Sequence, residues 1–427
     1  MFGGFGNGMT AQPVAPTAPL ERIHLLDVIR GFALLGILLM NIEYFQRPLL
    51  AMMQGFNTHQ TGLDYATAWV VYVFVQGKFY TMFALLFGMG FVLFLDRTAR
   101  KTCASPWLFG RRTLALALFG TLHIIFIWTG DILLTYAIAG LCLILFRSAS
   151  ARQLFSWSAL CILLPVGLYW LAVMGIQATV GAAKASDFVA QHQQLDALIR
   201  TGEQVYASGS FSEVLQYRLT ELAALYSDGG LIMTVLGILG IMLWGAALAR
   251  VGIFTRPTEH TQTLLGMLAM GLLIGLPSAL YVGSVVLELN TVIPDYDLSY
   301  IPSYKDAWVF TVQTLANFGL CFAYMAALAL AYTHLKPAQR ILTYLAPAGR
   351  MALTNYLTHS LVFTWLFYGY GLGLYSEFNR FSTTLMAGAL FAIQLGLSHW
   401  WLRRYQYGPL EWVWRCATYL RWQPLRR

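Results

Sequence analysis

Apolar residues recur along this chain in long runs of membrane-spanning length, from about Leu25 to about Trp401. Crossing a bilayer takes about 20 consecutive apolar residues in a helix, because no water is present there to bond to the backbone. The pattern therefore predicts an all-α, polytopic helical membrane protein with about ten transmembrane helices. These helices are expected near residues 25–43, 66–95, 112–129, 131–146, 153–176, 229–249, 261–289, 307–331, 351–372 and 382–402.

Two stretches depart from this rhythm. The second run is unusually long and is interrupted by Gly77-Lys78, so it is either one tilted helix or a segment broken near mid-membrane. Residues 177–228 form the largest loop, and apolar residues recur there at helical spacing, which predicts one or two amphipathic helices on the outer membrane surface. The remaining organisation is a disordered tail over 1–20, a helical bundle over 21–402 and a basic cytoplasmic tail over 403–427.

The distribution of basic residues predicts the orientation. On this span count, 20 of the 27 Lys and Arg residues fall on one side of the membrane, while most of the 19 acidic residues fall on the other. Because cytoplasmic loops carry the excess of Lys and Arg, both termini are expected in the cytoplasm. The net charge of +8 then reflects a basic face next to anionic lipid headgroups, and no nucleic-acid partner is needed to explain it. The five cysteines show no metal-ligand spacing, so no metal is expected.

Ionisable side chains within a span are costly to insert, so each is a functional candidate. Asp27 and Arg30 open the first span one turn apart, and Asn41 lies on the same stripe of that helix. The pair either fixes the bundle as a structural ion pair or presents Arg30 to a phosphate group. Lys78 lies near the middle of its segment and is expected to face a cavity or a carboxylate partner.

Histidines supply the candidate bases. His123 and Asp131 flank a tight outer turn, where the carboxylate can orient the imidazole as a general base, although a lone histidine is more often a packed core residue. Asn355 and His359 share a face of the ninth span, which Arg350 opens, and His359 is a second candidate base. His59, in the loop before the second span, is either solvated or part of an acceptor site.

Several stretches resemble the YeiB-like family of bacterial inner-membrane proteins, whose C-terminal half is classed as a domain of unknown function. The stretches are Leu26–Ile37, Gly77–Phe91, His123 with Gly130–Leu133, Gly349–Tyr356, Tyr368–Gly373 and Tyr407–Trp412. That family is distantly similar to transmembrane acyltransferases such as the heparan-alpha-glucosaminide N-acetyltransferases, mainly through Asp27-x-x-Arg30-Gly31. The resemblance implies transfer of an acyl group from a cytoplasmic thioester donor to an acceptor on the far side of the membrane.

Three functions fit these residues. In the first, a cross-membrane acyltransferase of the bacterial inner membrane, basic groups hold the phosphates of acyl-coenzyme A, other polar groups line the passage, and histidines act on a periplasmic glycan or lipid acceptor. The donor-binding residues are Arg30, Arg111, Arg112 and Arg350; the lining residues are Asp27, Asn41, His59, Lys78 and Asn355; the catalytic residues are His123, Asp131 and His359. The second is a transporter or lipid-handling protein without covalent chemistry, and the third is a structural membrane subunit.

Overall fold

The computed structural model describes residues 23–54, 60–99, 105–179, 182–292 and 301–427. Within these ranges the chain is helical apart from turns and connecting loops, and the only β-type pairing is an isolated bridge between Tyr405 and Arg426. The predicted all-α fold is confirmed. Eight helical segments are long and apolar enough to cross a membrane, and Leu133–Phe146 is a shorter apolar segment.

The first half of the described chain holds the helices that build most of the bundle. In order these are α1 (His24–Asn41), η2 (Ile42–Phe45), η3 (Leu49–Gln54), α2 (Gly62–Phe74), α3 (Lys78–Ala99), α4 (Ser105–Phe126), α5 (Leu133–Leu143), η4 (Ile144–Phe146), α6 (Ala151–Thr179), α7 (Ala182–Ser208) and α8 (Phe211–Leu225). Helices α7 and α8 occupy the loop for which one or two amphipathic helices were predicted.

The second half completes the bundle and adds short helices at one end. In order these are η5 (Ser227–Gly229), α9 (Gly230–Val251), α10 (Thr261–Met270), η6 (Gly271–Gly275), α11 (Leu276–Val292), α12 (Tyr304–His334), α13 (Lys336–Thr343), α14 (Ala346–Arg350), α15 (Ala352–Phe367), α16 (Arg380–Arg404) and α17 (Pro409–Tyr419). The predicted ninth span corresponds to α15, which at 16 residues is shorter than the eight membrane-length segments, and the basic segment over 403–427 contains α17.

The second predicted span is broken. Helix α2 ends at Phe74 and α3 begins at Lys78, and Gly77 between them has a φ of +83°, a left-handed value that favours glycine. The Nζ atom of Lys78 donates to the carbonyl oxygen of Tyr72 at 3.3 Å, near the end of α2. A buried cation at a helix C-terminus is stabilised by the free carbonyls there, so Lys78 fits the break that the sequence left open.

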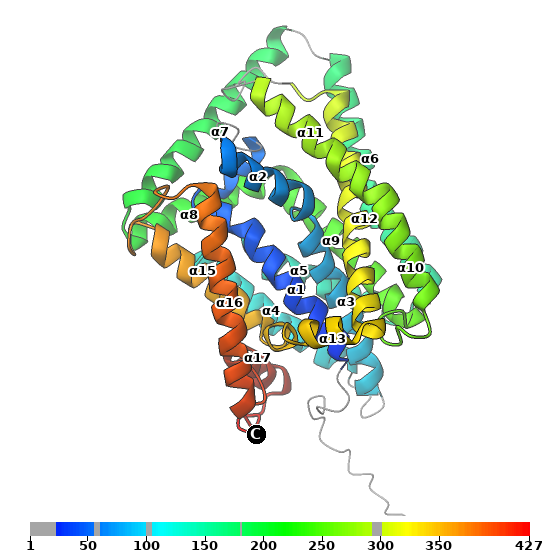
Figure 1. Ribbon diagram of the computed structural model, residues 1–427. Coiled ribbons are helices and arrows are strands. Elements are labelled where there is room, and N and C mark those ends of the chain that lie inside the picture. Colours follow the sequence, from blue (N-terminus) through cyan, green and yellow to red (C-terminus); the bar gives the residue numbers. More distant parts are fainter. Residues whose placement is uncertain (1–22, 55–59, 100–104, 180–181, 293–300) are drawn as a thin grey trace, which may run out of the picture.

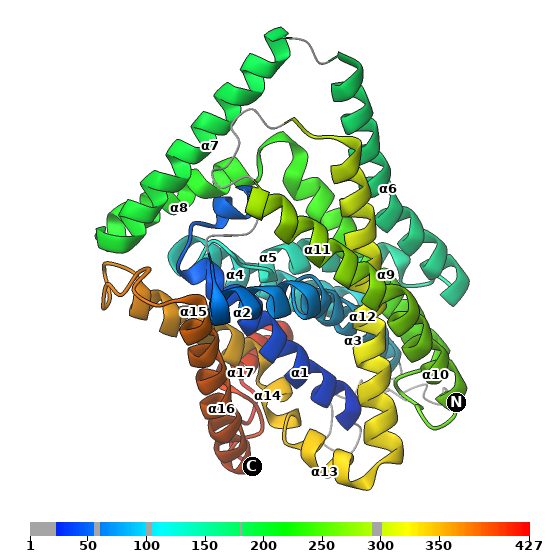
Figure 2. The same cartoon turned by 45° about the horizontal axis from the view of Figure 1, so that its top comes forward.

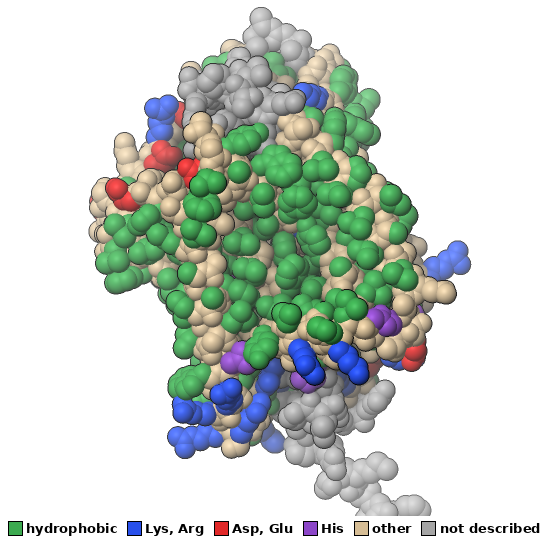
Figure 3. Space-filling model, in the orientation of Figure 1, with side chains coloured by type: hydrophobic (Ala, Val, Ile, Leu, Met, Phe, Trp, Pro, Cys, Tyr) green, Lys and Arg blue, Asp and Glu red, His purple; other side chains and the backbone are tan. Residues whose placement is uncertain are grey.

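The two ends of the molecule differ in charge. Lys and Arg gather at the end that holds α13 and α17, a broad hydrophobic band covers the middle, and a group of acidic side chains lies toward the opposite end, near α7 and α8 (Figures 1 and 3). Large apolar side chains such as Leu171, Leu273 and Leu385 are exposed within this band. The arrangement is that of a multi-pass membrane protein whose basic end faces the cytoplasm by the positive-inside rule.

Close helix packing in the centre depends on glycine. A Cβ atom added to Gly88 on α3 would collide with the backbone of Met242 on α9, and one added to Gly245 on α9 would collide with the backbone of Leu85. Small residues let membrane helices approach at backbone distance, where van der Waals packing replaces the hydrophobic effect. Helix α3 is therefore held against α9 on one side, while its other side faces α1, α4 and the cavity described next.

Candidate functional site

A cavity of about 290 Å³ penetrates the bundle from its basic end. It is enclosed by α1, α3, α4, α5, α14, α15 and α17, and its charged lining comprises Asp27, Arg30, Arg97, Arg112, Arg350, Glu411 and Arg415. Its apolar lining includes Phe83, Phe87, Leu116, Leu133 and Tyr136. Along α3 the lining runs from Arg97 to Phe83, which corresponds to about 21 Å of helix. The cavity is therefore basic at the cytoplasmic end and apolar at depth.

Glycines bring two of the arginines together at the basic end. A Cβ atom on Gly31 of α1 would strike the carbonyl oxygen of Leu345, and one on Gly349 of α14 would strike the carbonyl oxygen of Asp27. This contact places Arg350, the last residue of α14, beside the first turns of α1. There the Nη1 atom of Arg30 and the Oδ1 atom of Asp27 form an ion pair of 2.7 Å.

Helix α17 lines the cytoplasmic end of the cavity. The Oε1 atom of Glu411 accepts hydrogen bonds from the backbone amides of Leu353 and Thr354, at 2.7 and 3.1 Å, so it caps the N-terminus of α15. Burial raises the pKa of Glu411, although these hydrogen bonds act in the opposite direction. Trp414 donates from Nε1 to the carbonyl oxygen of Arg112 at 2.7 Å and lies 3.9 Å below its guanidinium.

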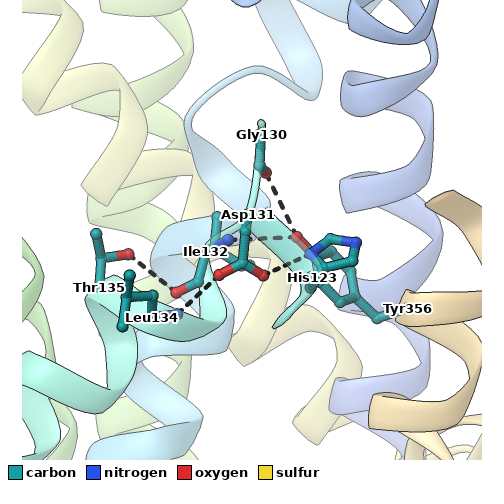
Figure 4. Close-up of polar contacts among 7 residues, drawn as sticks. All are labelled: His123, Gly130, Asp131, Ile132, Leu134, Thr135 and Tyr356. Carbon is teal, nitrogen blue, oxygen red and sulfur yellow. Dashed lines mark hydrogen bonds and ion pairs between the residues drawn. The ribbon is translucent and has the colours of Figure 1, made fainter. Parts of the chain in front are cut away.

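The inner end of the cavity borders a buried histidine–aspartate pair (Figure 4). The Nδ1 atom of His123 lies 2.8 Å from Oδ1 of Asp131, and Oδ2 of Asp131 accepts from the backbone amide of Leu134 at 2.8 Å. The carboxylate can only accept a hydrogen bond, so Nδ1 must carry the proton that it donates to Asp131. In this tautomer Nε2 has the free lone pair and is the basic atom. Nε2 has no hydrogen-bond partner among the described residues, and His123 is only 1% exposed.

Tyr356 lies between the cavity and this pair. Its ring lines the cavity and is centred 5.5 Å from the ring of His123. Its hydroxyl accepts from the backbone amide of Ile132 at 3.3 Å and donates to the carbonyl oxygen of Gly130 at 3.4 Å, which ties α15 to the α4–α5 turn (Figure 4). His123 is not among the residues that line the cavity, so Tyr356 and Ile132 form the wall between them.

Four of the candidate residues from the sequence, Asp27, Arg30, Arg112 and Arg350, meet in the cavity lining. His123 and Asp131 lie directly behind its inner wall, as described above. Arg111 and Asn41 are half-buried and are not among the lining residues, and His59 lies outside the described residues. Lys78 also does not line this cavity, because it faces the α2–α3 break.

His359 and Asn355 belong to a separate hydrogen-bond network between α15 and α16. The Nε2 atom of His359 lies 2.6 Å from Oε1 of Gln394, whose Nε2 atom donates to the carbonyl oxygen of Asn355 at 3.1 Å. The side chain of Asn355 donates to the carbonyl oxygen of Ala348 and to the hydroxyl of Ser398. Among the described residues, none of these partners bonds to His123 or lines the cavity, so the two histidine candidates do not share a site.

Several cavity residues were not singled out from the sequence as site residues. Arg97 and Arg415 counted only as cytoplasmic charges in the topology argument, although both line the cavity. Tyr356 and Glu411 each lie in a stretch that resembles the YeiB-like family, Gly349–Tyr356 and Tyr407–Trp412. Those stretches were the available signal, but nothing in them specified that Tyr356 would reach the α4–α5 turn.

Comparison with known proteins identifies the family. Residues 248–421 match the family model "Protein of unknown function (DUF418)", a range that includes α14, α15 and α17 of the cavity. The chain is 33% identical to the uncharacterized protein YxaH of Bacillus subtilis (strain 168), over 96% of this chain and 98% of that protein. It is 32% identical to the uncharacterized protein YeiB of Escherichia coli (strain K12), over 93% of this chain and 97% of that protein. The chain therefore belongs to the YeiB-like family of multi-pass membrane proteins.

Proposed function

We propose that this protein is a cross-membrane acyltransferase of the bacterial inner membrane. It takes an acyl group from a cytoplasmic thioester donor, acyl-coenzyme A, and passes it to a hydroxyl or amine of a periplasmic glycan or lipid. The observation that carries the proposal is one cavity that is basic at the cytoplasmic end and reaches, through Tyr356, the wall of the buried His123–Asp131 pair. The similarity to YeiB of Escherichia coli and the membrane-length helices support the inner-membrane location.

The cavity lining suits the chemistry of such a donor. Arginine binds phosphate through charge-assisted and often bidentate hydrogen bonds, and five arginines line the cavity toward its basic end. The apolar walls beyond them, including Phe83 and Phe87, suit an uncharged chain carrying the thioester inward. Asp27 and Glu411 do not oppose this charge strongly, because Asp27 is paired with Arg30 and Glu411 is engaged in capping α15.

The reaction would use the free nitrogen of His123. The acceptor hydroxyl or amine attacks the thioester carbonyl, so a C–O or C–N bond forms and the C–S bond breaks. His123 Nε2 takes the proton from the acceptor and returns it to the departing sulfur, while Asp131 stabilises the imidazolium through Nδ1. The side chain of Tyr356 has to move for the thioester to reach Nε2, because it stands between the cavity and the imidazole.

A second candidate function is the binding and transfer of an anionic lipid without covalent chemistry. The observation that favours it is the wall formed by Tyr356 and Ile132, which separates the cavity from His123. A cavity without access to His123 would still hold a phosphate headgroup and an apolar tail. The two candidates differ in whether a thiol is released.

The deciding experiment is thiol release from acetyl-coenzyme A by the purified protein in the presence of an outer-side amine or glycan acceptor. Under the proposal, wild type releases free coenzyme A and His123→Ala does not, while both elute as folded, monodisperse protein. The matched control is His399→Ala, because His399 is half-buried away from the cavity, and its ring nitrogen bonds to the carbonyl oxygen of Tyr344. Equal release by wild type and His123→Ala would refute the acyltransferase, and binding of coenzyme A without release in any variant would favour lipid handling.

A further inference from the structure

Helix α8 buries both of the charged residues on its inner face. Arg218 and Glu221 are each 0% exposed, although the helix lies near the acidic end of the molecule, where a surface helix would expose its charges (Figure 2). Glu213, by contrast, is exposed and forms the capping box with Ser210 that begins α8. Burying an arginine is costly unless it is paired and fully hydrogen-bonded, so its partners decide what it does.

Arg218 has too few partners for a structural role alone. Its Nη1 atom donates to the carbonyl oxygen of Ile125 at 2.8 Å, near the end of α4. Its Nε and Nη2 atoms have no hydrogen-bond acceptor within the described part of the chain, where no carboxylate forms an ion pair with it either. A guanidinium carries five donors in a planar fork, so the remaining side of Arg218 is suited to two parallel bonds with an oxyanion.

Glu221 is committed to other groups. Its Oε1 atom accepts from the backbone amide of Leu50 at 3.2 Å, and its Oε2 atom accepts from the hydroxyl of Tyr206 at 2.7 Å. Burial raises the pKa of Glu221, which reduces the negative charge available to neutralise Arg218. Glu221 therefore does not neutralise the buried positive charge of Arg218 on the same helix.

Tyr206, which bonds to Glu221, belongs to a cluster of aromatic side chains. Tyr206 stacks on Tyr368 with ring centroids 4.5 Å apart and lies 6.2 Å from the ring of Tyr375. The hydroxyl of Tyr375 is buried and has no partner among the described residues, so a second unused polar group belongs to the same cluster. Each tyrosine combines a rigid apolar ring with a polar hydroxyl, so the cluster can hold a polar group in an apolar setting.

The cluster lies on the outer side of the His123–Asp131 pair. Ile125, which Arg218 contacts, follows His123 by two residues on α4. Thr129, whose hydroxyl is 3.3 Å from that of Tyr206, precedes Asp131 by two residues in the α4–α5 turn. The donor cavity and this cluster thus approach the same turn from opposite ends of the bundle.

We propose that the unused edge of the Arg218 guanidinium binds a single oxyanion, a phosphate or carboxylate, carried by a ligand from the outer leaflet or the outer solution. Calling that ligand the acceptor rests on the proposed acyl transfer, whereas the binding itself does not. The ligand reaches the cluster when α7 and α8, which pack on each other and on η3 at the outer end, move aside (Figure 2).

The test is the thermal unfolding midpoint of the full-length protein in nanodiscs. Inorganic phosphate is titrated in phosphatidylcholine discs, and a parallel arm adds phosphatidylglycerol to the discs without phosphate. A rise of the midpoint in the first arm supports a soluble oxyanion, and a rise in the second supports a lipid headgroup. Absence of a rise in both arms overturns the proposal.

Three variants make the test specific. Arg218→Met removes the charge at similar length and should abolish the rise, or weaken half-saturation by at least about tenfold. Arg218→Lys keeps the charge and a donor for the carbonyl oxygen of Ile125, but it lacks the planar fork of the guanidinium. It should therefore fold and bind the anion several-fold more weakly than wild type. A response equal to wild type in either folded variant overturns the proposal. The matched control is Arg200→Met, because Arg200 is exposed on α7 and forms a surface ion pair with Asp196. His123→Ala should keep the wild-type rise. A wild-type protein that binds the anion but releases no coenzyme A rejects the proposed activity alone.

Discussion

The carboxylate of Glu411 accepts hydrogen bonds from both the backbone amide and the hydroxyl of Thr354, at 3.1 and 2.6 Å, across 57 residues of sequence. The hydroxyl of Thr354 in turn accepts from the backbone amide of Leu410. This reciprocal contact joins the start of α15, which carries Tyr356, to the start of α17, which carries Trp414. The lining that α17 gives to the cavity is therefore tied by hydrogen bonds to α15, which carries Tyr356 of the inner wall.

Glu411→Ala should lower the free energy of unfolding by about 2 kcal/mol, because it leaves the buried amides of Leu353 and Thr354 without an acceptor. Thermal unfolding of the purified protein measures this loss, and coenzyme A binding should weaken with it. Glu377→Ala is the control, because Glu377 is exposed. The stability of this variant should equal that of wild type. An unchanged midpoint in Glu411→Ala would show that the cap is not required.

Glu221 should make stability depend on pH in a defined direction. Burial raises its pKa in the folded protein above the ordinary value of 4.5, so the native state binds the proton more tightly than the unfolded chain. This contribution is complete below the unfolded pKa and is lost as pH rises through the folded pKa. The unfolding midpoint of wild type should therefore fall relative to Glu221→Gln as pH is raised from about 4.5. The opposite slope, or no difference between the two proteins, contradicts a protonated carboxyl.

Gly349→Ala should separate α14 from α1, because the added Cβ atom meets the carbonyl oxygen of Asp27, and backbone cannot give way as a flexible side chain can. We expect a loss of about 2 kcal/mol in stability and weaker binding of coenzyme A, since Arg350 moves with α14. Gly396→Ala on α16 is the matched control, because open space surrounds that position. Its midpoint should equal or exceed that of wild type, and a fall of equal size in both variants would remove the argument for close contact.

Asp131→Asn should slow acyl transfer by at least about a hundredfold, because an amide no longer fixes the Nδ1–H tautomer or stabilises the imidazolium. The loss should appear in kcat and leave the KM for acetyl-coenzyme A near the wild-type value, as Asp131 is not in the cavity lining. Asp196→Asn, which alters the exposed pair with Arg200 on α7, serves as the control. A rise in KM with unchanged kcat would assign Asp131 to binding.

Lys78→Met should leave coenzyme A binding unchanged, since Lys78 faces the α2–α3 break and not the cavity. Its stability should be equal or higher, because an apolar chain of similar size replaces a buried cation. Arg30→Gln is the comparison, and it should weaken binding by about tenfold through loss of a phosphate contact. Strong loss of binding in Lys78→Met would mean that the break and the cavity communicate.

The membrane architecture could be predicted because it depends on local quantities. Run length and apolarity specify spans, and the interruption at Gly77-Lys78 marked the break that separates α2 from α3. The approximate helix positions follow from the same signal. Residue content alone also indicated which charges gather at the basic end.

The composition of the site was only partly predictable, since it depends on helix rotation and on contacts between distant segments. Arg111 and Arg112 are adjacent in sequence, but only Arg112 lines the cavity, because neighbours on a helix point about 100° apart. His359 and Tyr356 are only three residues apart on α15, yet His359 bonds to Gln394 of α16 and only Tyr356 reaches the α4–α5 turn. The burial of Arg218 and Glu221 was invisible in a segment that reads as a surface helix, because it requires Tyr206 and Leu50 from other elements.

The seating of α17 against Thr354 also has a consequence for biosynthesis. A chain that ends at Gly408 still contains α16, the last apolar span of the described residues. Such a chain keeps every segment needed to cross the membrane, yet its cavity lacks the lining of α17, and the amides of Leu353 and Thr354 lack their acceptor. A stop codon just before Pro409 should therefore yield an embedded protein that does not bind the donor.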